Sequence, residues 1–163
     1  RVYVPKGSKL LSVEGQTREF NSPPLDYDAL NFRRDPQVEA EEGLVIVDEE
    51  SGTRIYDDAG KTVFANWVYV SPQENVVIRY QYLLPFRLSM NGATKPADAY
   101  SLLVQKQSGS RGSKIITNID YPAEFTAIWR YPEMSGSEKE RQIEYEADLK
   151  TDKFFGVAFT KND

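Results

Sequence analysis

The stretch QIEYEADL, residues 142–149, decides what kind of fold this chain can adopt. It closes a segment, residues 135–150, whose serine, glutamate and lysine residues could be written as a capped helix. Its apolar residues, however, fall on every second position: Ile143, Tyr145, Ala147 and Leu149. A period of two is that of a strand with one buried face, because successive side chains of a strand point to opposite sides. We therefore predict a loop followed by a strand.

The same alternation recurs along most of the chain. Further examples are RVYV (1–4), KLLSVEG (9–15), GLVIVDEE (43–50), TRIYDD (53–58), TVFANWVYV (62–70), NVVIRYQYLL (75–84), AYSLLVQKQ (99–107), KIITNIDYP (114–122), EFTAIWRY (124–131) and KFFGVAFTK (153–161). About nine or ten short strands predict an all-β fold, namely an antiparallel β-sandwich of immunoglobulin-like or fibronectin-like type. We expect it to form a single domain over residues 1–163.

Two of these stretches make more specific predictions. TVFANWVYV and NVVIRYQYLL are joined by SPQEN, a loop whose length suits a β-hairpin between them. In AYSLLVQKQ, the alternation predicts that Tyr100, Leu102 and Val104 are buried and that Ser101 and Leu103 lie on the opposite face.

The composition removes several classes of chemistry. The chain has 163 residues with no cysteine and no histidine. Disulfides, thiolate metal sites, histidine-based zinc sites and catalytic triads that use histidine are therefore excluded. The net charge of −5, from 25 acidic and 20 basic residues, argues against nucleic acid as a partner. No apolar run in these 163 residues approaches the ~18 residues of a membrane span, and the sequence contains no signal-peptide pattern.

One long segment lacks the strand pattern. Residues 21–43 contain three prolines and little alternation, and they lie between two predicted strands. Connections of this length are unusual in compact domains and are often functional or mobile. We interpret the segment as a long loop or insertion that either meanders or docks to a partner, and we take Tyr27 and Phe32 as its partner-contact candidates.

The tripeptide GKT, residues 60–62, invites comparison with a phosphate-binding loop. Such a loop needs a glycine five residues before the Gly-Lys pair, where this chain has Ile55, and it needs a helix to follow. A predicted strand follows instead. We therefore predict a hairpin turn in which Gly60 adopts a positive φ.

The loop SGSRGS, residues 108–113, also contains glycines and a basic residue. Two backbone N–H groups beside Arg111 could form an anion-binding nest, but the loop lies between two predicted strands. We predict a turn, and we take Lys106 and Arg111 as candidates for contact with a partner if the tip of the loop docks.

Carboxylates cluster at four places: Asp26/Asp28, Glu39/Glu41/Glu42, Asp48/Glu49/Glu50 and Asp57/Asp58. Clusters made only of oxygen ligands suit calcium. Asp26 and Asp28 have the most suitable spacing, yet the chain carries no EF-hand pattern. We predict no cofactor and no metal requirement, with Asp26 and Asp28 as the residues that a calcium site would use. No spacing favours the paired carboxylates of a glycosidase.

Aromatic residues make up 12% of the chain, including two tryptophans. Exposed tryptophan and tyrosine rings can bind sugars by stacking on their apolar faces. Trp67 and Trp129 stand in the middle of predicted strands among apolar neighbours, and we predict that they pack in the core.

Three stretches together resemble a known family: RVYVPKGSKLLSVEG (1–15), GKTVFANWVYVSPQENVVIRYQYLLP (60–85) and YSLLVQKQSGSRGS (100–113). They resemble the C-terminal β-rich region of a bacterial family of membrane-anchored envelope proteins of unknown function. The resemblance covers about a third of the chain. It implies a location outside the cytoplasmic membrane, in a parent protein with a single N-terminal membrane helix and a long exported part. We accordingly expect the chain to be a fragment of a larger protein.

These observations lead to a functional expectation. We expect a non-catalytic interaction or structural module of a bacterial cell envelope, with another envelope protein or a cell-wall polymer as partner and no catalytic residues. A carbohydrate-binding module is the alternative, and a glycan-directed enzyme is a further one. Exposed tryptophans on one flat face would favour the carbohydrate-binding module, and a cleft with two facing carboxylates would favour the enzyme.

Overall fold

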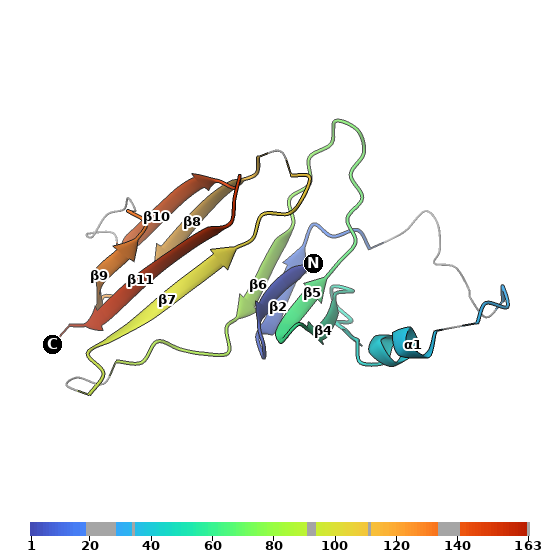
Figure 1. Ribbon diagram of the computed structural model, residues 1–163, viewed down its shortest axis with the longest axis horizontal. Helices are drawn as coiled ribbons and strands as arrows, with labels where there is room; N and C mark the ends of the chain where they lie inside the picture. Colours follow the sequence, from blue (N-terminus) through green and yellow to red (C-terminus); the bar gives the residue numbers. More distant parts are fainter. Residues whose placement is uncertain (19–28, 34, 91–93, 111, 134–140, 163) are drawn as a thin grey trace. The chain divides into compact units, whose positions relative to one another are not determined.

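The computed structural model describes residues 1–18, 29–33, 35–90, 94–110, 112–133 and 141–162. Over these residues the chain is all-β, with eleven antiparallel strands in several small sheets and one short helix (Figure 1). The predicted all-β class with antiparallel strands is therefore confirmed, and the β-sandwich type stays a prediction. The chain divides into two compact units, Arg1–Arg87 and Leu88–Asp163, which are called unit 1 and unit 2 below. The single domain expected over residues 1–163 stays a prediction.

Unit 1 is built around the short strand β5. Its elements are β1 (Val2–Pro5), β2 (Lys9–Glu14), α1 (Pro36–Glu42), β3 (Ile46–Val47), β4 (Arg54–Asp58), β5 (Lys61–Ala65) and β6 (Arg79–Leu83). One sheet has the order β1-β5-β4-β3, and β2 pairs with β6 in a second sheet. Three consecutive residues of β5, Thr62, Val63 and Phe64, are buried, so both faces of this strand are covered.

The turn between β4 and β5 confirms the reading of residues 60–62. Asp58 pairs with Lys61, and the two residues between them both have positive φ, 49° at Ala59 and 70° at Gly60. This left-handed pair matches the twist of the flanking strands, as in other two-residue hairpins. Gly60 therefore lies in a hairpin turn, and Lys61 and Thr62 begin β5.

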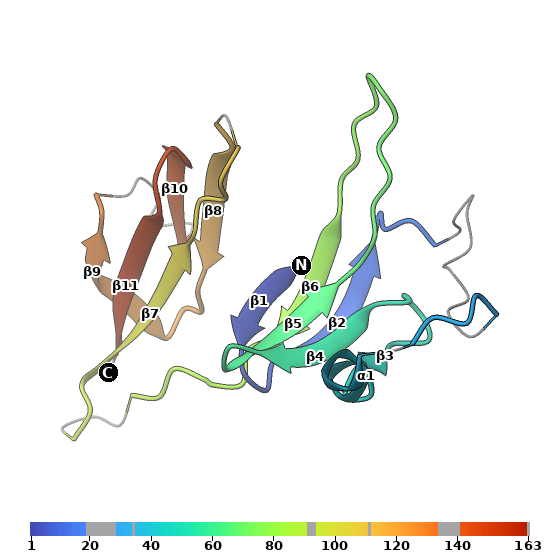
Figure 2. The same ribbon diagram turned by 45° about the vertical axis from the view of Figure 1, so that its right-hand side comes forward.

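The hairpin predicted between residues 62 and 84 is wrong in its pairing. A turn does form at residues 71–74, where the Glu74 amide donates to the Ser71 carbonyl oxygen at 3.0 Å. The flanking strands β5 and β6, however, pair with β4 and β1 and with β2, and not with each other. Residues 66–78 instead form an extended arm between them, which Figure 2 shows between the arrows of β5 and β6.

β5 and β6 do not pair because the residues just after β2 contact both halves of this arm. The Thr17 amide donates to the carbonyl oxygen of Trp67 at 3.0 Å, and the Tyr69 amide donates to the Thr17 hydroxyl at 2.9 Å. In the other half of the arm, Val77 lies so close to Gly15 that a Cβ atom on Gly15 would be 1.9 Å from the Val77 carbonyl oxygen. A segment far away in the sequence thus supplies the contacts that a hairpin would have made within itself.

Helix α1 lies inside the segment that we predicted to be a loop. Asp35 caps it: its carboxylate accepts hydrogen bonds from the amides of Gln37 at 2.8 Å and Val38 at 3.3 Å. Pro36 occupies the first helical position, where its missing N–H and fixed φ fit. The prediction of a loop over residues 21–43 is therefore wrong for Pro36–Glu42.

Unit 2 consists of two sheets that enclose a core. Its strands are β7 (Ala97–Val104), β8 (Lys114–Asp120), β9 (Phe125–Tyr131), β10 (Gln142–Asp148) and β11 (Lys153–Lys161). The strand orders are β7-β11-β9 and β10-β8. The core is centred on Phe155, Val157 and Phe159 of β11 and on Ile143 of β10, which are at most 2% exposed.

The alternations that predicted β7 and β10 hold in the structure. Ile143 and Tyr145 of β10 face the core, which confirms the strand predicted for QIEYEADL. In β7, Tyr100 and Leu102 pack against the core while Ser101 and Leu103 are exposed. Residues 108–110 and 112–113 turn the chain, with positive φ at Gly109 and Gly112.

A carboxylate holds the start of β7 to the segment before it. Asp98 accepts hydrogen bonds from the Ser89 amide at 2.8 Å and pairs with the Lys95 ammonium at 2.7 Å. Both contacts stabilise the ionised carboxylate, and the Lys95 hydrogen bond, the largest contribution, together with the Ser89 amide lowers the pKa of Asp98 to about 2.

We predict that Asp98→Asn lowers the stability of unit 2 at neutral pH. A depressed pKa adds stability above the unfolded-state pKa of about 4, and this stability is lost as pH falls towards 2. The gap between wild type and Asp98→Asn, measured by urea unfolding, should therefore shrink between about pH 4 and pH 2. The exposed carboxylate Glu133, changed to glutamine, is the control. A gap that is constant over this range would contradict the prediction.

Candidate functional site

The outer side of the sheet β7-β11-β9 carries four large apolar side chains. They are Leu103 on β7, Phe154 on β11, and Trp129 and Tyr131 on β9. Leu103 lies opposite Phe154 in the ladder, and residues opposite one another project to the same side of a sheet. All four side chains are between 45% and 56% exposed, so none is covered as a core residue would be. We call this surface the aromatic face.

A β-bulge brings Trp129 to this side. In the ladder between β11 and β9, Ala158 pairs with Trp129 and the next residue, Phe159, pairs with Ala127. Ile128 is therefore an extra residue, and every side chain after it changes side. The prediction that Trp129 packs in the core is wrong, because it assumed that the alternation through Phe125 and Ala127 continued without a break.

A floor of small residues lies beside the rings. Gly156 pairs with Tyr131 on one side and with Ser101 on the other, and Ala158 pairs with Trp129 and Ala99. A Cβ atom on Gly156 would be 3.1 Å from Cζ3 of Trp129, so the indole lies directly on the glycine backbone. The glycine thus lets the ring approach the sheet.

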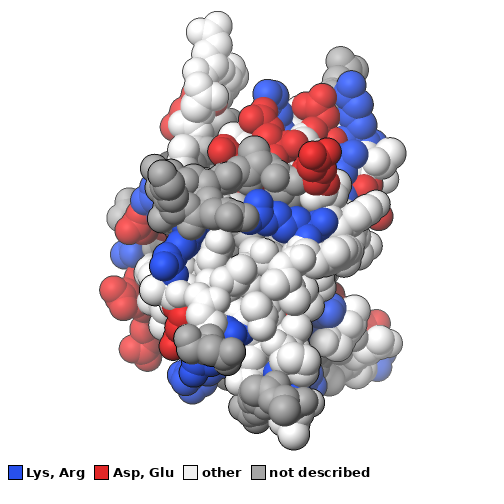
Figure 3. Space-filling model, turned by 90° about the vertical axis from the view of Figure 1, so that its left-hand side faces the viewer, with Lys and Arg blue, Asp and Glu red and all other residues white. Residues whose placement is uncertain are grey.

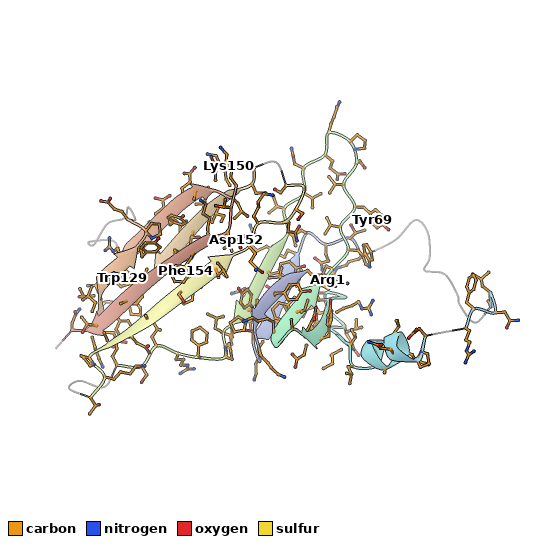
Figure 4. The ribbon with its side chains drawn as sticks, viewed as in Figure 1. Arg1, Tyr69, Trp129, Lys150, Asp152 and Phe154 are labelled. Carbon is orange, nitrogen blue, oxygen red and sulfur yellow. The ribbon has the colours of Figure 1, made fainter. Side chains whose placement is uncertain are left out.

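The rings are arranged in a row. The planes of Trp129 and Tyr131 are nearly parallel, at 9°, with centroids 6.2 Å apart, and the Tyr131 and Phe154 centroids are 6.1 Å apart at 42°. Figure 4 labels Trp129 on β9 and Phe154 on β11 of the same sheet. Because these side chains come from paired strands with a buried core beneath, their spacing is fixed by the ladder.

The aromatic face contains no charged residue. Its large side chains and its floor residues are all uncharged. Figure 3 shows another view of the charges: on this side of the molecule, Lys and Arg and Asp and Glu side chains alternate with uncharged surface. A neutral, partly flat surface suits a ligand that offers apolar faces and hydroxyl groups rather than charge.

Unit 1 offers a second candidate, an open groove of about 1410 Å³. Its lining includes Arg54, Tyr56 and Asp58 of β4 and also Trp67, which is 68% exposed. The prediction that Trp67 packs in the core is therefore also wrong. Trp67 lies on the arm, beyond the last residue of β5.

Two acidic residues of this groove, Asp57 and Asp58, have structural partners. Asp58 accepts a hydrogen bond from the Tyr3 hydroxyl at 2.9 Å. Asp57 accepts one from the Thr62 hydroxyl at 3.2 Å and lies 3.1 Å from the Lys6 ammonium. These contacts explain the carboxylates as parts of the fold, and the groove does not present them as the facing pair of a glycosidase.

Asp48 has a structural role as well. Its carboxylate accepts hydrogen bonds from the amide and the hydroxyl of Ser51, and these bonds lower the pKa of Asp48. The Ser51 hydroxyl in turn contacts the buried Thr53 hydroxyl at 2.6 Å. Among the described residues no group of three or more acidic side chains is placed to hold a metal ion.

The residues predicted as contacts or ligands have mixed outcomes. Asp26, Asp28, Tyr27 and Arg111 lie outside the described residues. Phe32 is described and is 58% exposed. Lys106 follows the end of β7, where its amide donates to Asp152 at 2.8 Å and its ammonium donates to the Gln107 carbonyl oxygen at 2.9 Å. The structure does not place Phe32 or Lys106 on the aromatic face.

No residue of the aromatic face was among the predicted site residues: Trp129 was predicted to pack in the core, and Leu103, Tyr131, Phe154 and Gly156 were not predicted as contacts. One signal for them exists in the sequence. Gly156 stands in the middle of KFFGVAFTK, and a glycine inside a strand pattern often marks a bulge or a close approach. In this structure the bulge lies in the adjacent strand at Ile128, and the close approach is that of the Trp129 ring to Gly156.

No helix in the described part of the chain is long and apolar enough to cross a membrane. Comparisons of the chain with family models, with curated proteins and with solved structures found no match.

Proposed function

We propose that this chain is a non-catalytic binding module of a bacterial cell envelope, and that the aromatic face of unit 2 binds a cell-wall polysaccharide. The observation that carries the proposal is the exposed, nearly parallel pair of Trp129 and Tyr131 on the face of a sheet. The resemblance of residues 1–15, 60–85 and 100–113 to envelope proteins supports the location outside the cytoplasmic membrane. The two sheets of unit 2 support an immunoglobulin-like or fibronectin-like β-sandwich.

The chemistry of the face favours a glycan. The axial C–H groups of a pyranose ring form an apolar side that stacks on an aromatic ring, and the hydroxyl groups at its rim remain in water. Rings that are locked in place lose little conformational entropy on binding, which favours affinity. Ser101 and the Tyr131 hydroxyl add hydrogen-bonding groups beside the rings without adding charge.

We predict that Trp129→Ala removes most of the polysaccharide binding and leaves the fold intact. An exposed side chain contributes little to folding, but a tryptophan at the centre of a binding surface commonly contributes about 2 kcal/mol, which is about 30-fold in Kd. Co-sedimentation with purified peptidoglycan sacculi, with cellulose and chitin as comparison polymers, measures the loss. Circular dichroism checks the fold.

Trp67→Ala is the matched control, because it removes the other exposed tryptophan, from unit 1. It should bind as wild type does. If Trp67→Ala abolishes binding and Trp129→Ala does not, the binding surface is the groove of unit 1. If the wild type sediments with none of the polymers, the polysaccharide proposal is wrong.

A further inference from the structure

The aromatic face is open on its solvent side. Its large side chains come from all three strands of the sheet, Leu103 from β7, Phe154 from β11, and Trp129 and Tyr131 from β9, and each keeps about half of its surface exposed. Closed ligand pockets bury most of the bound molecule, and they therefore suit small molecules and chain ends. An open face lets a polymer continue in both directions beyond the rings, so this geometry suits an internal stretch of a chain.

Two hydroxyl groups stand on opposite sides of Gly156 in one rung of the sheet. Gly156 pairs with Ser101 on β7 and with Tyr131 on β9. Because neighbouring strands are ~4.8 Å apart, the Cα atoms of Ser101 and Tyr131 lie about 10 Å apart, and Gly156 between them carries no side chain. Neither hydroxyl bonds to another described residue. Each can therefore donate to, or accept from, a hydroxyl group of a ligand.

The ladder positions that face the same side carry no charge. They are Ala99, Ser101 and Leu103 on β7, Phe154, Gly156 and Ala158 on β11, and Trp129 and Tyr131 on β9. An anionic polymer, such as one linked by phosphodiesters, needs cationic partners to offset the loss of water from its charges. These positions offer none, whereas a neutral sugar backbone needs only apolar contact and hydroxyl partners. The face therefore favours an uncharged chain.

We propose that the aromatic face binds an internal stretch of an uncharged polysaccharide backbone, an assignment that rests on the proposed function and specifies its ligand. One sugar lies across the rings between the hydroxyl groups of Ser101 and Tyr131. Its apolar C–H groups contact the rings, and hydroxyl groups on its opposite rims bond to the two side chains. The module then holds glycan chains that are already part of a wall, and it binds neither chain ends nor phosphate-linked wall polymers.

The first test is the stoichiometry on long soluble chains. Isothermal titration of the 163-residue chain with glycol chitin and with hydroxyethyl cellulose should show several modules bound per polymer chain, because internal sites repeat along a polymer. The Kd should change by less than about twofold between low salt and about 0.5 M NaCl, since the contact contains no charge pair that salt could screen. Poly(glycerol phosphate) should not bind. One module per polymer chain, or binding that salt weakens strongly, overturns the proposed ligand.

The second test removes each hydroxyl group and keeps the apolar surface. Ser101→Ala and Tyr131→Phe should each raise Kd about threefold to tenfold, the usual effect of losing one uncharged hydrogen bond. Ser12→Ala is the matched control, because it removes an exposed serine hydroxyl from β2 of unit 1. It should bind as the wild type does, and circular dichroism should show that all three variants fold. If either Ser101→Ala or Tyr131→Phe leaves Kd unchanged, the sugar does not lie between these two hydroxyls.

The two levels of the proposal fail in different ways. If Trp129→Ala removes binding but only one module binds per polymer chain, the aromatic face binds polysaccharide at chain ends, and only the internal stretch is wrong. If the wild type binds poly(glycerol phosphate) in a salt-dependent manner, the uncharged backbone is wrong. If the wild type binds none of the polymers, the proposed function itself is wrong, and the ligand assigned to it is wrong as well.

Discussion

Gly15→Ala is expected to destabilise unit 1 by about 3 kcal/mol or more, a large fraction of the free energy of unfolding of a small unit. Two effects add. Gly15 has a φ of +84°, a region in which a residue with a Cβ costs roughly 1–2 kcal/mol. The new Cβ would also be 1.9 Å from the carbonyl oxygen of Val77, and neither atom is the end of a flexible side chain that could move away.

The control for this variant is another glycine of the same unit. Gly52 has a φ of +69° and no atom within 4 Å of a Cβ built on it. Gly52→Ala therefore measures the backbone cost alone, about 1 kcal/mol, and the difference between the two variants measures the close approach. If the two variants lose the same stability, the arm does not lie against Gly15 as described.

The two tryptophans make the measurement specific. Trp67 lies in unit 1 and Trp129 in unit 2, and the chain has no others. In a Trp129→Phe background, fluorescence during urea unfolding reports on Trp67, whose carbonyl oxygen accepts the hydrogen bond from Thr17 two residues after Gly15. Gly15→Ala should shift the midpoint of this transition to much lower urea.

The strands could be predicted from the sequence because their cause is local. A strand with one face on a core repeats every second residue, so the pattern of Ile143 and Tyr145 or of Tyr100 and Leu102 specifies both the strand and its buried side. The turn at Gly60 was likewise predictable from the residue type alone.

The errors have two kinds of cause. The α1 cap was a local signal that we missed: aspartate followed by proline, at Asp35 and Pro36, commonly starts a helix. The other errors are not local. The bulge at Ile128 depends on how β9 pairs with β11. The failure of β5 and β6 to pair depends on the chain just after β2, where Thr17 bonds to Trp67, 50 residues later in the sequence. Alternation in one strand cannot reveal either contact.

The aromatic face could not be predicted because it depends on the bulge at Ile128, which is one of these non-local features. Read without the bulge, β9 places Trp129 in the core and leaves the outer side of the sheet without a tryptophan. With the bulge, the same residues make a row of exposed rings over Gly156. One extra residue therefore decides whether the sequence describes a well-filled core or a binding surface, which is why the binding residues could not be chosen from the sequence alone.

Phe155→Ala is expected to destabilise unit 2 by about 3–5 kcal/mol. Phe155 is fully buried, and its ring contacts those of Tyr100 on β7 and Tyr145 on β10, at centroid distances of 6.4 and 5.7 Å. It therefore joins both sheets of the unit, and removing it leaves a cavity that strands paired on either side cannot close. Urea unfolding followed by Trp129 fluorescence, in a Trp67→Phe background, measures the loss.

Its neighbour in sequence provides the matched control. Phe154 has the same side chain on the same strand, but it is 45% exposed on the aromatic face. Phe154→Ala should cost less than about 1 kcal/mol of stability, as expected for an exposed substitution, while weakening polysaccharide binding. Two adjacent phenylalanines would then separate the functions of the two faces of β11, with Phe155 holding the unit together and Phe154 contacting the ligand. Equal losses of stability in the two variants would show that the outer face is itself covered, and the aromatic face would then be a packing surface rather than a binding one.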